Sequence, residues 1–416
     1  MTAAAQTLAR LRAGELQGIT QLDLHDCGLE ALPAEVMTLA DSLEVLDLSG
    51  NALSTLPEGL SHLTKLHTLF ASGNRFKDLP AVLGRLPRLD TLGFKANQIA
   101  DVSASALAPT LRWLILTDNR IESLPPSLTD CTRLQKLMLA GNRLCQWPRG
   151  MGRLQRLELL RLSANRFEQA EDALPEELLA IPQLAWLAYA GNPFGAGREQ
   201  SALASANPRS IPWAELLLQD RMGEGASGYI YAALWRPAGA PAQEVALKLF
   251  KGAVTSDGLP RSEMTATQVA GRHPHLVGVL GVLEGHPQNT EGLVMPRLAP
   301  QWAPLAGPPS MASCTRDVYG ADLRLPPARA EAIAHAVTDA LCHLHDRGLL
   351  HGDLYAHNLL VDGQGNALLS DFGAASFLPV DDRSRREALQ ALDRRALRIL
   401  IDELSQRSDG DTPQEV

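Results

Sequence analysis

A lysine and a glutamate in the second half of the chain have the types and spacing needed to handle phosphate. Lys248 lies inside the strand-like run Glu244–Leu249. An ammonium group within an apolar strand is costly unless an anionic partner compensates its charge. Glu263 follows 15 residues later, in the helix-like segment 261–270. We therefore expect the partner of Lys248 to be a phosphate group, a carboxylate, or both.

Further motifs surround this pair along the chain. The segment 223–230 contains Gly223, Gly225 and Gly228, a pattern that is weak alone because glycine-rich turns are common. Downstream, the run His-Gly-Asp-Leu-Tyr-Ala-His-Asn-Leu-Leu occupies residues 351–360. The triplet Asp-Phe-Gly begins at Asp371, thirteen residues after Asn358. The order and spacing of these motifs are informative where each motif alone is not.

Together these motifs resemble the signature set of the protein kinases, over roughly residues 212–405. The resemblance implies ATP and Mg²⁺ as cofactors. Lys248 would hold the α- and β-phosphates and pair with Glu263, and Asp371 and Asn358 would contact Mg²⁺. Asp353 would orient the acceptor hydroxyl and take its proton. The backbone of the three glycines would approach the phosphates closely, since no side chain obstructs it.

The same resemblance places the adenine ring. Met295 falls at the gatekeeper position, and Leu298 falls in the hinge. Ile230 and Ala246 complete the nucleotide-binding residues that the resemblance implies. Asp393 resembles the buried aspartate that anchors the catalytic loop from a later helix.

The pattern departs from the family at several positions. Gly352 replaces the usual arginine, which makes control by phosphorylation of an activation loop unexpected. Tyr355 replaces the lysine of Ser/Thr-type loops, and His357 stands where Tyr-type loops have arginine. No Ala-Pro-Glu motif follows, and Asp393 comes too soon after Asp371 for a normal peptide platform. The chain also ends shortly after that helix, which predicts a short C-terminal lobe. A proline-rich insertion occupies residues 300–309 after the hinge, and the segment 315–319 that follows it is unassigned and is a candidate cover for the nucleotide cleft.

Several elements must position these groups. A strand is expected over 213–221, ahead of the glycines, and a second strand carries Lys248. A helical pattern runs from Pro327 to Gly348, with Ile333, Val337, Leu341 and Leu344 on one face. It leads directly into the loop that contains Asp353.

The first half of the chain is a repeat. The pattern L-x-x-L-x-L-x-x-N recurs with starts 22 to 27 residues apart, and it resembles a leucine-rich repeat over roughly the first 200 residues. Each unit would place a short strand on the concave face and its leucines in the core. The asparagine would satisfy backbone groups at the turn after the strand. The N-terminal segment 7–16 is expected to be a helical cap. The repeats begin at Ile19, Leu43, Leu66, Leu89, Leu111, Leu134, Leu157 and Leu184.

The variable strand positions include an apolar strip where polar residues would be usual. Because these residues cluster, a surface that binds a protein partner is favoured over scattered exposed side chains, and coverage by the second domain is the other reading of the strip. The strip consists of Phe70, Trp113, Ile115, Met138, Leu159 and Trp186.

Composition excludes some classes of function. The formal net charge is −9, which disfavours general binding to nucleic acid or to anionic membranes. No apolar run is long enough to span a bilayer, and the N-terminus lacks the pattern of a secretory signal. The odd number of cysteines, 5, without a framework of spacings is typical of a cytoplasmic protein with reduced thiols.

The sequence thus predicts an α/β leucine-rich-repeat solenoid over 1–197, a linker over 198–211, and an α+β bilobal kinase-like domain of bacterial type over 212–416. The expected function is an ATP-dependent protein kinase, with a Ser/Thr acceptor, that binds a partner or substrate through its repeats. Two alternatives stay open: a catalytically weak scaffold that senses nucleotide, and a small-molecule phosphotransferase. Retention of every phosphate and metal residue favours activity.

Overall fold

The structure, a computed structural model, describes residues 3–206, 209–225, 227–251, 254–255 and 257–408. Its contacts divide the chain into two compact units, Met1–Leu184 and Ala185–Val416. Within the described residues, no helix is both long enough and apolar enough to cross a membrane.

Short parallel strands form the sheet of the first unit. Each strand pairs in register with the next one along the chain, so that the central leucines Leu22, Leu46 and Leu69 are paired one after another and buried. The strands are β1 (Gln21–Asp23), β2 (Val45–Asp47), β3 (Thr68–Phe70), β4 (Thr91–Gly93), β5 (Trp113–Ile115), β6 (Lys136–Met138) and β7 (Leu159–Arg161).

Buried asparagines join one repeat to the next, as the repeat pattern predicts. The side-chain nitrogen of Asn119 donates to the carbonyl oxygens of Phe94 and Leu116, at 2.9 and 3.0 Å, and its oxygen accepts the Ile99 N–H at 3.0 Å. Asn51, Asn74, Asn97, Asn142 and Asn165 make equivalent hydrogen bonds. Backbone groups that have no ladder partner after each strand are thereby satisfied.

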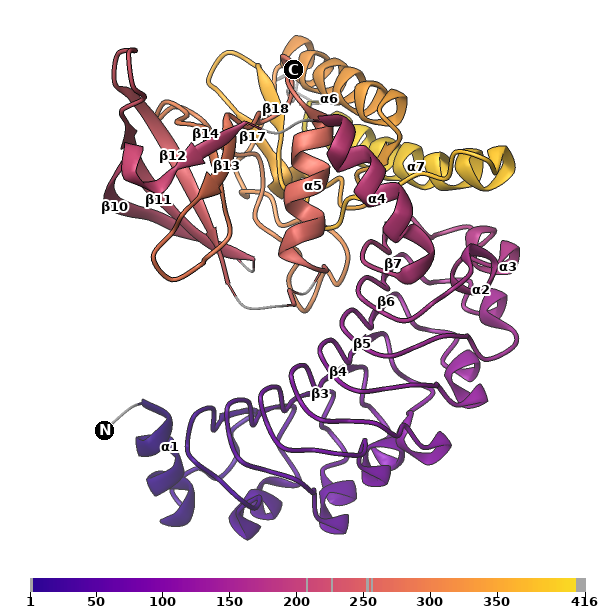
Figure 1. Ribbon diagram of the computed structural model, residues 1–416. Helices are drawn as coiled ribbons and strands as arrows, with labels where there is room; N and C mark the ends of the chain where they lie inside the picture. The colour runs from indigo at the N-terminus through magenta and orange to yellow at the C-terminus, as the bar shows by residue number, and fades with distance from the viewer. Residues whose placement is uncertain (1–2, 207–208, 226, 252–253, 256, 409–416) are drawn as a thin grey trace, which may run out of the picture. The chain divides into compact units, whose positions relative to one another are not determined.

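The opposite side of the first unit consists of short helices (Figure 1). Several begin directly after a proline in extended conformation, such as Pro57 and Pro125, because proline fixes its own φ and cannot continue a preceding helix. Helix α1 (Ala3–Arg12) contacts β1, the first strand of the sheet, and η1. The remaining helices are η1 (Ala34–Leu39), η2 (Glu58–His62), η3 (Ala81–Arg85), η4 (Ala104–Ala106), η5 (Pro126–Asp130), η6 (Met151–Arg153), α2 (Ala170–Ala173) and α3 (Glu176–Leu179).

The second unit begins within the last repeat of the sequence. Strand β8 (Trp186–Ala188) and helix α4 (Pro193–Ala206) both belong to it. Most of the described part of the expected linker 198–211 is therefore regular structure, since α4 continues to Ala206 and β9 (Ser210–Pro212) follows. The unit boundary lies at Leu184/Ala185, ahead of the boundary at 197 that the repeat pattern suggests.

A six-stranded sheet forms the first lobe of this unit, with strand order β10-β11-β12-β14-β13-β9. Its core contains Leu216, Trp235, Val245 and Val294. Helix α5 (Pro260–Ala270) accompanies the sheet (Figure 1). The strands are β10 (Leu216–Glu224), β11 (Gly228–Trp235), β12 (Gln243–Phe250), β13 (Gly281–Glu284) and β14 (Gly292–Pro296), and η7 (Trp213–Glu215) precedes β10.

The second lobe is mainly helical. Helix α6 (Pro327–Asp346) buries Ile333, Val337, Leu341 and Leu344, the face that the sequence pattern predicts. It packs against α7 (Arg383–Ser408). Along the chain, α6 is followed by β16 (Leu349–Leu350), η8 (Ala356–Asn358), β17 (Leu359–Val361), β18 (Ala367–Leu369) and β19 (Ser376–Phe377), and then by α7. Strand β15 (Ala303–Pro304), which precedes α6, pairs with β17. The unit thus has the bilobal α+β architecture that the sequence predicts.

Candidate active site

A cavity of about 420 Å³ lies in the second unit and receives side chains from both lobes. Ile230, Ala246 and Met295 come from the sheet, Leu298 comes from the segment directly after β14, and Leu360 comes from β17. Met222, Trp302 and Phe372 add further apolar surface. This lining suits a flat, apolar ring system, and it contains all four side chains that the sequence assigns to the adenine pocket.

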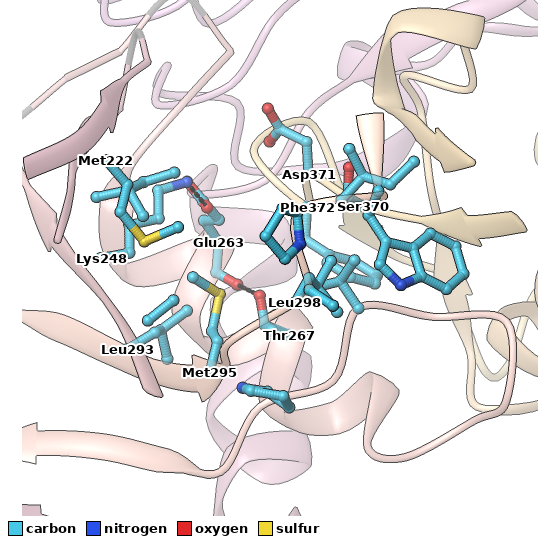
Figure 2. Close-up of a pocket in the computed structure, with 18 residues that line it drawn as sticks. Met222, Lys248, Glu263, Thr267, Leu293, Met295, Leu298, Ser370, Asp371 and Phe372 are labelled. Carbon is cyan, nitrogen blue, oxygen red and sulfur yellow. Dashed lines mark hydrogen bonds and ion pairs between the residues drawn. The ribbon is translucent and has the colours of Figure 1, made fainter. Parts of the chain in front are cut away.

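Lys248 and Glu263 both line this cavity and contact each other. The Lys248 ammonium group donates to the Glu263 carboxylate in an ion pair, and their side chains are 12% and 5% exposed. Figure 2 shows this pair beside Asp371. Burial raises the pKa of the Glu263 carboxyl, Lys248 opposes that effect, and the negative charge of Asp371 adds to it. A carboxylate is thus one partner of Lys248, as the sequence suggested.

A smaller, more polar cavity of about 110 Å³ adjoins the first one. Lys248, Asp371, Gly225 and Gly228 line it. A cation and a carboxylate face the same space, which is the arrangement needed to hold an anionic group together with a divalent cation.

The three glycines of the hairpin differ in their surroundings. A Cβ atom at Gly228 would lie 2.4 Å from the carbonyl oxygen of Leu249, so the sheet itself requires glycine there. A Cβ atom at Gly223 or Gly225 would meet no protein atom within 4 Å. Gly223 pairs with Ile230 within the β10–β11 hairpin, and the Gly225 N–H donates to the Gly228 carbonyl.

Asp353 and Asn358 face each other across the loop after β16. The Asn358 side-chain nitrogen donates to the Asp353 carboxylate at 2.8 Å and to the Asp353 carbonyl at 2.9 Å. Both donor hydrogens of the amide are thereby used, which leaves the amide oxygen to accept a donor or bind a cation. The loop holds Asp353 in one orientation through this pair.

Asp393 on α7 anchors the base of the same loop, as the sequence predicts. It is buried, and its carboxylate accepts the backbone N–H groups of His351 at 2.9 Å and Gly352 at 3.0 Å. His345 also lies 3.0 Å from it. A buried carboxylate with several donors is satisfied, so the loop is fixed at two successive residues.

Asp371 adopts an unusual backbone conformation with φ of +59°. Its carboxylate accepts the Gly373 N–H at 2.9 Å, and the next side chain, Phe372, packs against the His351 ring at 5.6 Å. Left-handed conformations are uncommon for residues other than glycine and cluster at functional sites. The turn directs the Asp371 carboxylate into the polar cavity.

One polar pair near the loop carries no sequence signal. His357 Nδ1 lies 2.7 Å from the buried Asp317 carboxylate, which also accepts the His357 N–H at 3.1 Å. Burial by itself lowers the pKa of His357, but the hydrogen bond to Asp317 and the charges of Asp353, Asp317 and Asp371 outweigh burial and raise it. Asp317 belongs to the segment that sequence reasoning left unassigned.

The side chains present fit ATP with Mg²⁺. Asp371 and Asn358 offer the carboxylate and amide oxygens that Mg²⁺ prefers. Lys248 offers an ammonium group beside the space that phosphates would occupy, and the larger cavity offers apolar walls for a purine. Phosphoryl transfer requires mainly such positioning and charge compensation.

The residues of the apolar strip differ in their exposure, and some are buried. Phe70, Gly93, Ile115 and Met138 form one row in register across β3 to β6, and the Phe70 ring covers Gly93, where a Cβ atom would lie 2.5 Å from the ring. The Lys136 ammonium group lies 4.2 Å from the centre of the Trp113 ring. Phe70, Trp113 and Ile115 are partly exposed, whereas Met138 and Leu159 are buried.

Trp186 does not fit the strip. It is 1% exposed and belongs to the second unit, where it stacks on Tyr355. The expectation that Trp186 faces a separate partner protein is therefore wrong, and its alternative, contact with the protein's own second domain, holds. Repeat periodicity alone places a strand residue on a face but does not reveal what covers it.

Comparisons with known proteins agree with this description. A family model described as a protein kinase domain matches residues 217–389. A model described as a leucine rich repeat matches residues 17–76 and 109–167. The chain carries leucine-rich repeats followed by a protein kinase domain.

Individual relatives match part of the chain at modest identity. A salt tolerance receptor-like cytoplasmic kinase from Oryza sativa subsp. japonica is 30% identical over 199 residues, which are 45% of this chain and 51% of the relative. The serine/threonine-protein kinase mos of Xenopus laevis is 28% identical over 183 residues, with coverages of 42% and 46%. A cell division control protein 2 homolog of Antirrhinum majus is 25% identical over 186 residues, with coverages of 44% and 57%. The chain thus spans about half the length of these relatives.

Proposed function

We propose that the protein is an ATP- and Mg²⁺-dependent protein kinase that transfers phosphate to serine or threonine. The observation that carries the proposal is the convergence of Lys248, Glu263 and Asp371 on one cavity system with apolar walls. Two of the relatives described above are named as kinases, and the mos relative is called a serine/threonine-protein kinase.

The residues would divide the work as follows. Lys248, fixed by Glu263, binds the α- and β-phosphates. Asp371 and the Asn358 amide oxygen bind Mg²⁺, which supplies charge compensation on the phosphates. Asp353, oriented by the Asn358 side-chain nitrogen, accepts the hydrogen bond of the acceptor hydroxyl and takes its proton. With the nucleotide held in this way, the acceptor hydroxyl would receive the γ-phosphoryl group, Asp353 would take the hydroxyl proton, and ADP would leave.

The repeats would bind a protein partner or substrate. Phe70, Trp113 and Ile115 offer a partly exposed apolar surface in the first unit. We place the protein in the cytoplasm, because all five cysteines are free thiols, and one of the relatives above is called a cytoplasmic kinase. The net charge of −9 speaks against a nucleic-acid partner.

The test is transfer of label from γ-labelled ATP with Mg²⁺ to the protein itself and to casein. Asp353→Asn is expected to lower the transfer rate by about 10²–10⁴-fold, the usual contribution of a positioned base, while ATP binding persists. Asp371→Asn is expected to abolish transfer because the cation loses its carboxylate ligand. Asp362→Asn, at a partly exposed position in the turn between β17 and β18, is the matched control and should behave as wild type.

The outcomes separate the alternatives. Equal transfer by wild type and Asp371→Asn would refute the assignment of the site. ATP binding without transfer to any protein acceptor would favour the nucleotide-sensing scaffold. Transfer to small hydroxyl compounds alone would favour the small-molecule phosphotransferase.

A further inference from the structure

The last repeat motif of the sequence contributes a tryptophan to the loop that holds Asp353. The Trp186 indole N–H donates to the carbonyl oxygen of Leu354 at 3.0 Å. The ring lies parallel to the Tyr355 ring, with centroids 4.4 Å apart and planes inclined by 7°. The Arg316 guanidinium group also lies over the indole, 5.1 Å from its centre. Trp186 therefore fixes the two residues that directly follow Asp353.

Tyr189, three residues later, fixes a second segment of the site. Its backbone N–H donates to the Ser376 hydroxyl at 3.0 Å, and its phenol donates to the Phe377 carbonyl at 2.9 Å. Ser376 and Phe377 form β19, which pairs with β16 immediately before His351. The residues after Asp371 and the residues before Asp353 thus share one support.

Gly352 gives independent evidence of this close approach. Its φ is +72°, and a Cβ atom there would lie 2.4 Å from the Leu187 carbonyl oxygen and 2.9 Å from the Ala374 carbonyl oxygen. Only glycine tolerates both the conformation and the contact. The backbone of β8 therefore packs so closely against the residue before Asp353 that a side chain has no room there.

Helix α4 extends the support to the other lobe. One Glu199 carboxylate oxygen accepts the Gly191 N–H at 2.8 Å, and the other accepts the Ser262 hydroxyl at 3.1 Å. Ser262 precedes Glu263, the partner of Lys248, on α5. A single segment, residues 185–206, therefore contacts the catalytic loop, the segment after Asp371, and the helix that carries Glu263.

We propose that Trp186 and Tyr189, although they belong to a repeat in the sequence, are positioning residues for phosphoryl transfer that hold the Asp353 loop in its working geometry. The proposal rests on the proposed kinase function and deepens it. The segment 185–206 supports a loop in which Gly352 and Tyr355 stand where the family pattern has arginine and lysine. The phosphotransferase then needs part of the last repeat in order to work.

The test uses the full chain with Trp186→Leu, which removes both the stack and the hydrogen bond. We expect kcat to fall about 10- to 100-fold, since displacement of a reacting group by about 1 Å costs on the order of 10²-fold. The KM for ATP should stay within about twofold of wild type, because Trp186 lines neither nucleotide cavity. A role in general folding alone would not produce this division between kcat and KM.

Conservative variants sharpen the result. Trp186→Phe keeps an aromatic ring against Tyr355 and should recover part of the lost kcat, while Tyr189→Phe loses only the bond to Phe377. The matched control is Trp147→Leu in the repeats, because Trp147 also donates to a backbone carbonyl, that of Ala173 at 2.9 Å, and packs on Phe167. It should leave kcat unchanged.

Hydrogen exchange of the backbone amides in residues 349–358 provides a readout that does not depend on transfer. Trp186→Leu should accelerate exchange there, and Trp147→Leu should not. If wild type transfers phosphate but Trp186→Leu matches it in kcat and in exchange, the inference is overturned. If wild type transfers nothing, the proposed function fails, and the exchange result alone decides whether Trp186 holds the loop.

Discussion

Replacement of Gly352 by alanine tests how tightly the catalytic loop and β8 are fitted together. A residue with a Cβ in the left-handed region costs about 1–2 kcal/mol relative to glycine. The new methyl group would also lie 2.4 Å from the Leu187 carbonyl oxygen, well inside van der Waals contact. Overpacking of this kind costs about 1–3 kcal/mol. We therefore expect Gly352→Ala to lower the free energy of unfolding of the second unit by about 2–5 kcal/mol.

Urea unfolding of the full chain measures this loss. Because the chain has two compact units, the data are fitted with two transitions, and the transition that moves to higher urea with bound nucleotide is assigned to the second unit. Gly363→Ala is the matched control, since a Cβ atom there would meet no atom within 4 Å and its φ is not in the left-handed region. It should change stability by less than about 1 kcal/mol. Equal midpoints for Gly352→Ala and Gly363→Ala would refute the close packing of β8 on this loop.

Two other changes probe the loop and the repeats. Asp317→Asn should lower the pKa of His357, measured by the NMR titration of its ring, because the hydrogen bond and one negative charge that raise this pKa are lost. Since the folded pKa is raised, the pair's contribution to stability is fully present below the unfolded histidine pKa of about 6.5 and is lost as pH rises through the folded value. The variant should therefore lose more stability, relative to wild type, at pH 6 than at pH 9. An unchanged titration midpoint would contradict this account. Asn119→Ala should destabilise the first unit by about 2–5 kcal/mol, because the Phe94 and Leu116 carbonyls and the Ile99 N–H lose their partner in the core. Urea unfolding measures this loss as a shift of the transition that does not respond to nucleotide, which belongs to the first unit. Asn289→Ala, in the second unit, is the control and should leave the midpoint of that transition unchanged.

Much of the site followed from short-range sequence patterns. The lysine within an apolar strand predicted an anionic partner, phosphate or carboxylate, and the structure contains the Lys248–Glu263 ion pair. The resemblance of Asp393 to the buried aspartate of the kinases implied an anchor for the loop, and the structure contains its hydrogen bonds to His351 and Gly352. The repeat period similarly predicted the hydrogen bonds of the buried asparagines. For the lysine and the asparagines, the chemistry of the residue type leaves few alternatives for the partner.

The contacts that sequence reasoning missed join segments that share no motif. Trp186 and Leu354 are separated by 168 residues, and Asp317 and His357 by 40. Periodicity placed Trp186 on a strand face, but whether solvent or another segment covers that face depends on the whole fold. Gly352 was interpreted only as the loss of an arginine, whereas its positive φ and its contact with Leu187 supply a steric reason for glycine. The available signal was a glycine at a position where the family usually has a large side chain.

The position of β8 in the second unit also bears on how such chains can be recombined. A cassette cut at residue 212, where the kinase motifs begin, would leave Tyr355 without its stacking partner and Ser376 without the Tyr189 N–H. Grafting foreign repeats onto that cassette would not replace them, because an ordinary repeat has no reason to place an indole at that point. An expression fragment of the kinase domain therefore has to begin at Ala185 or earlier, and a chimaera with other repeats has to retain β8 together with the kinase domain.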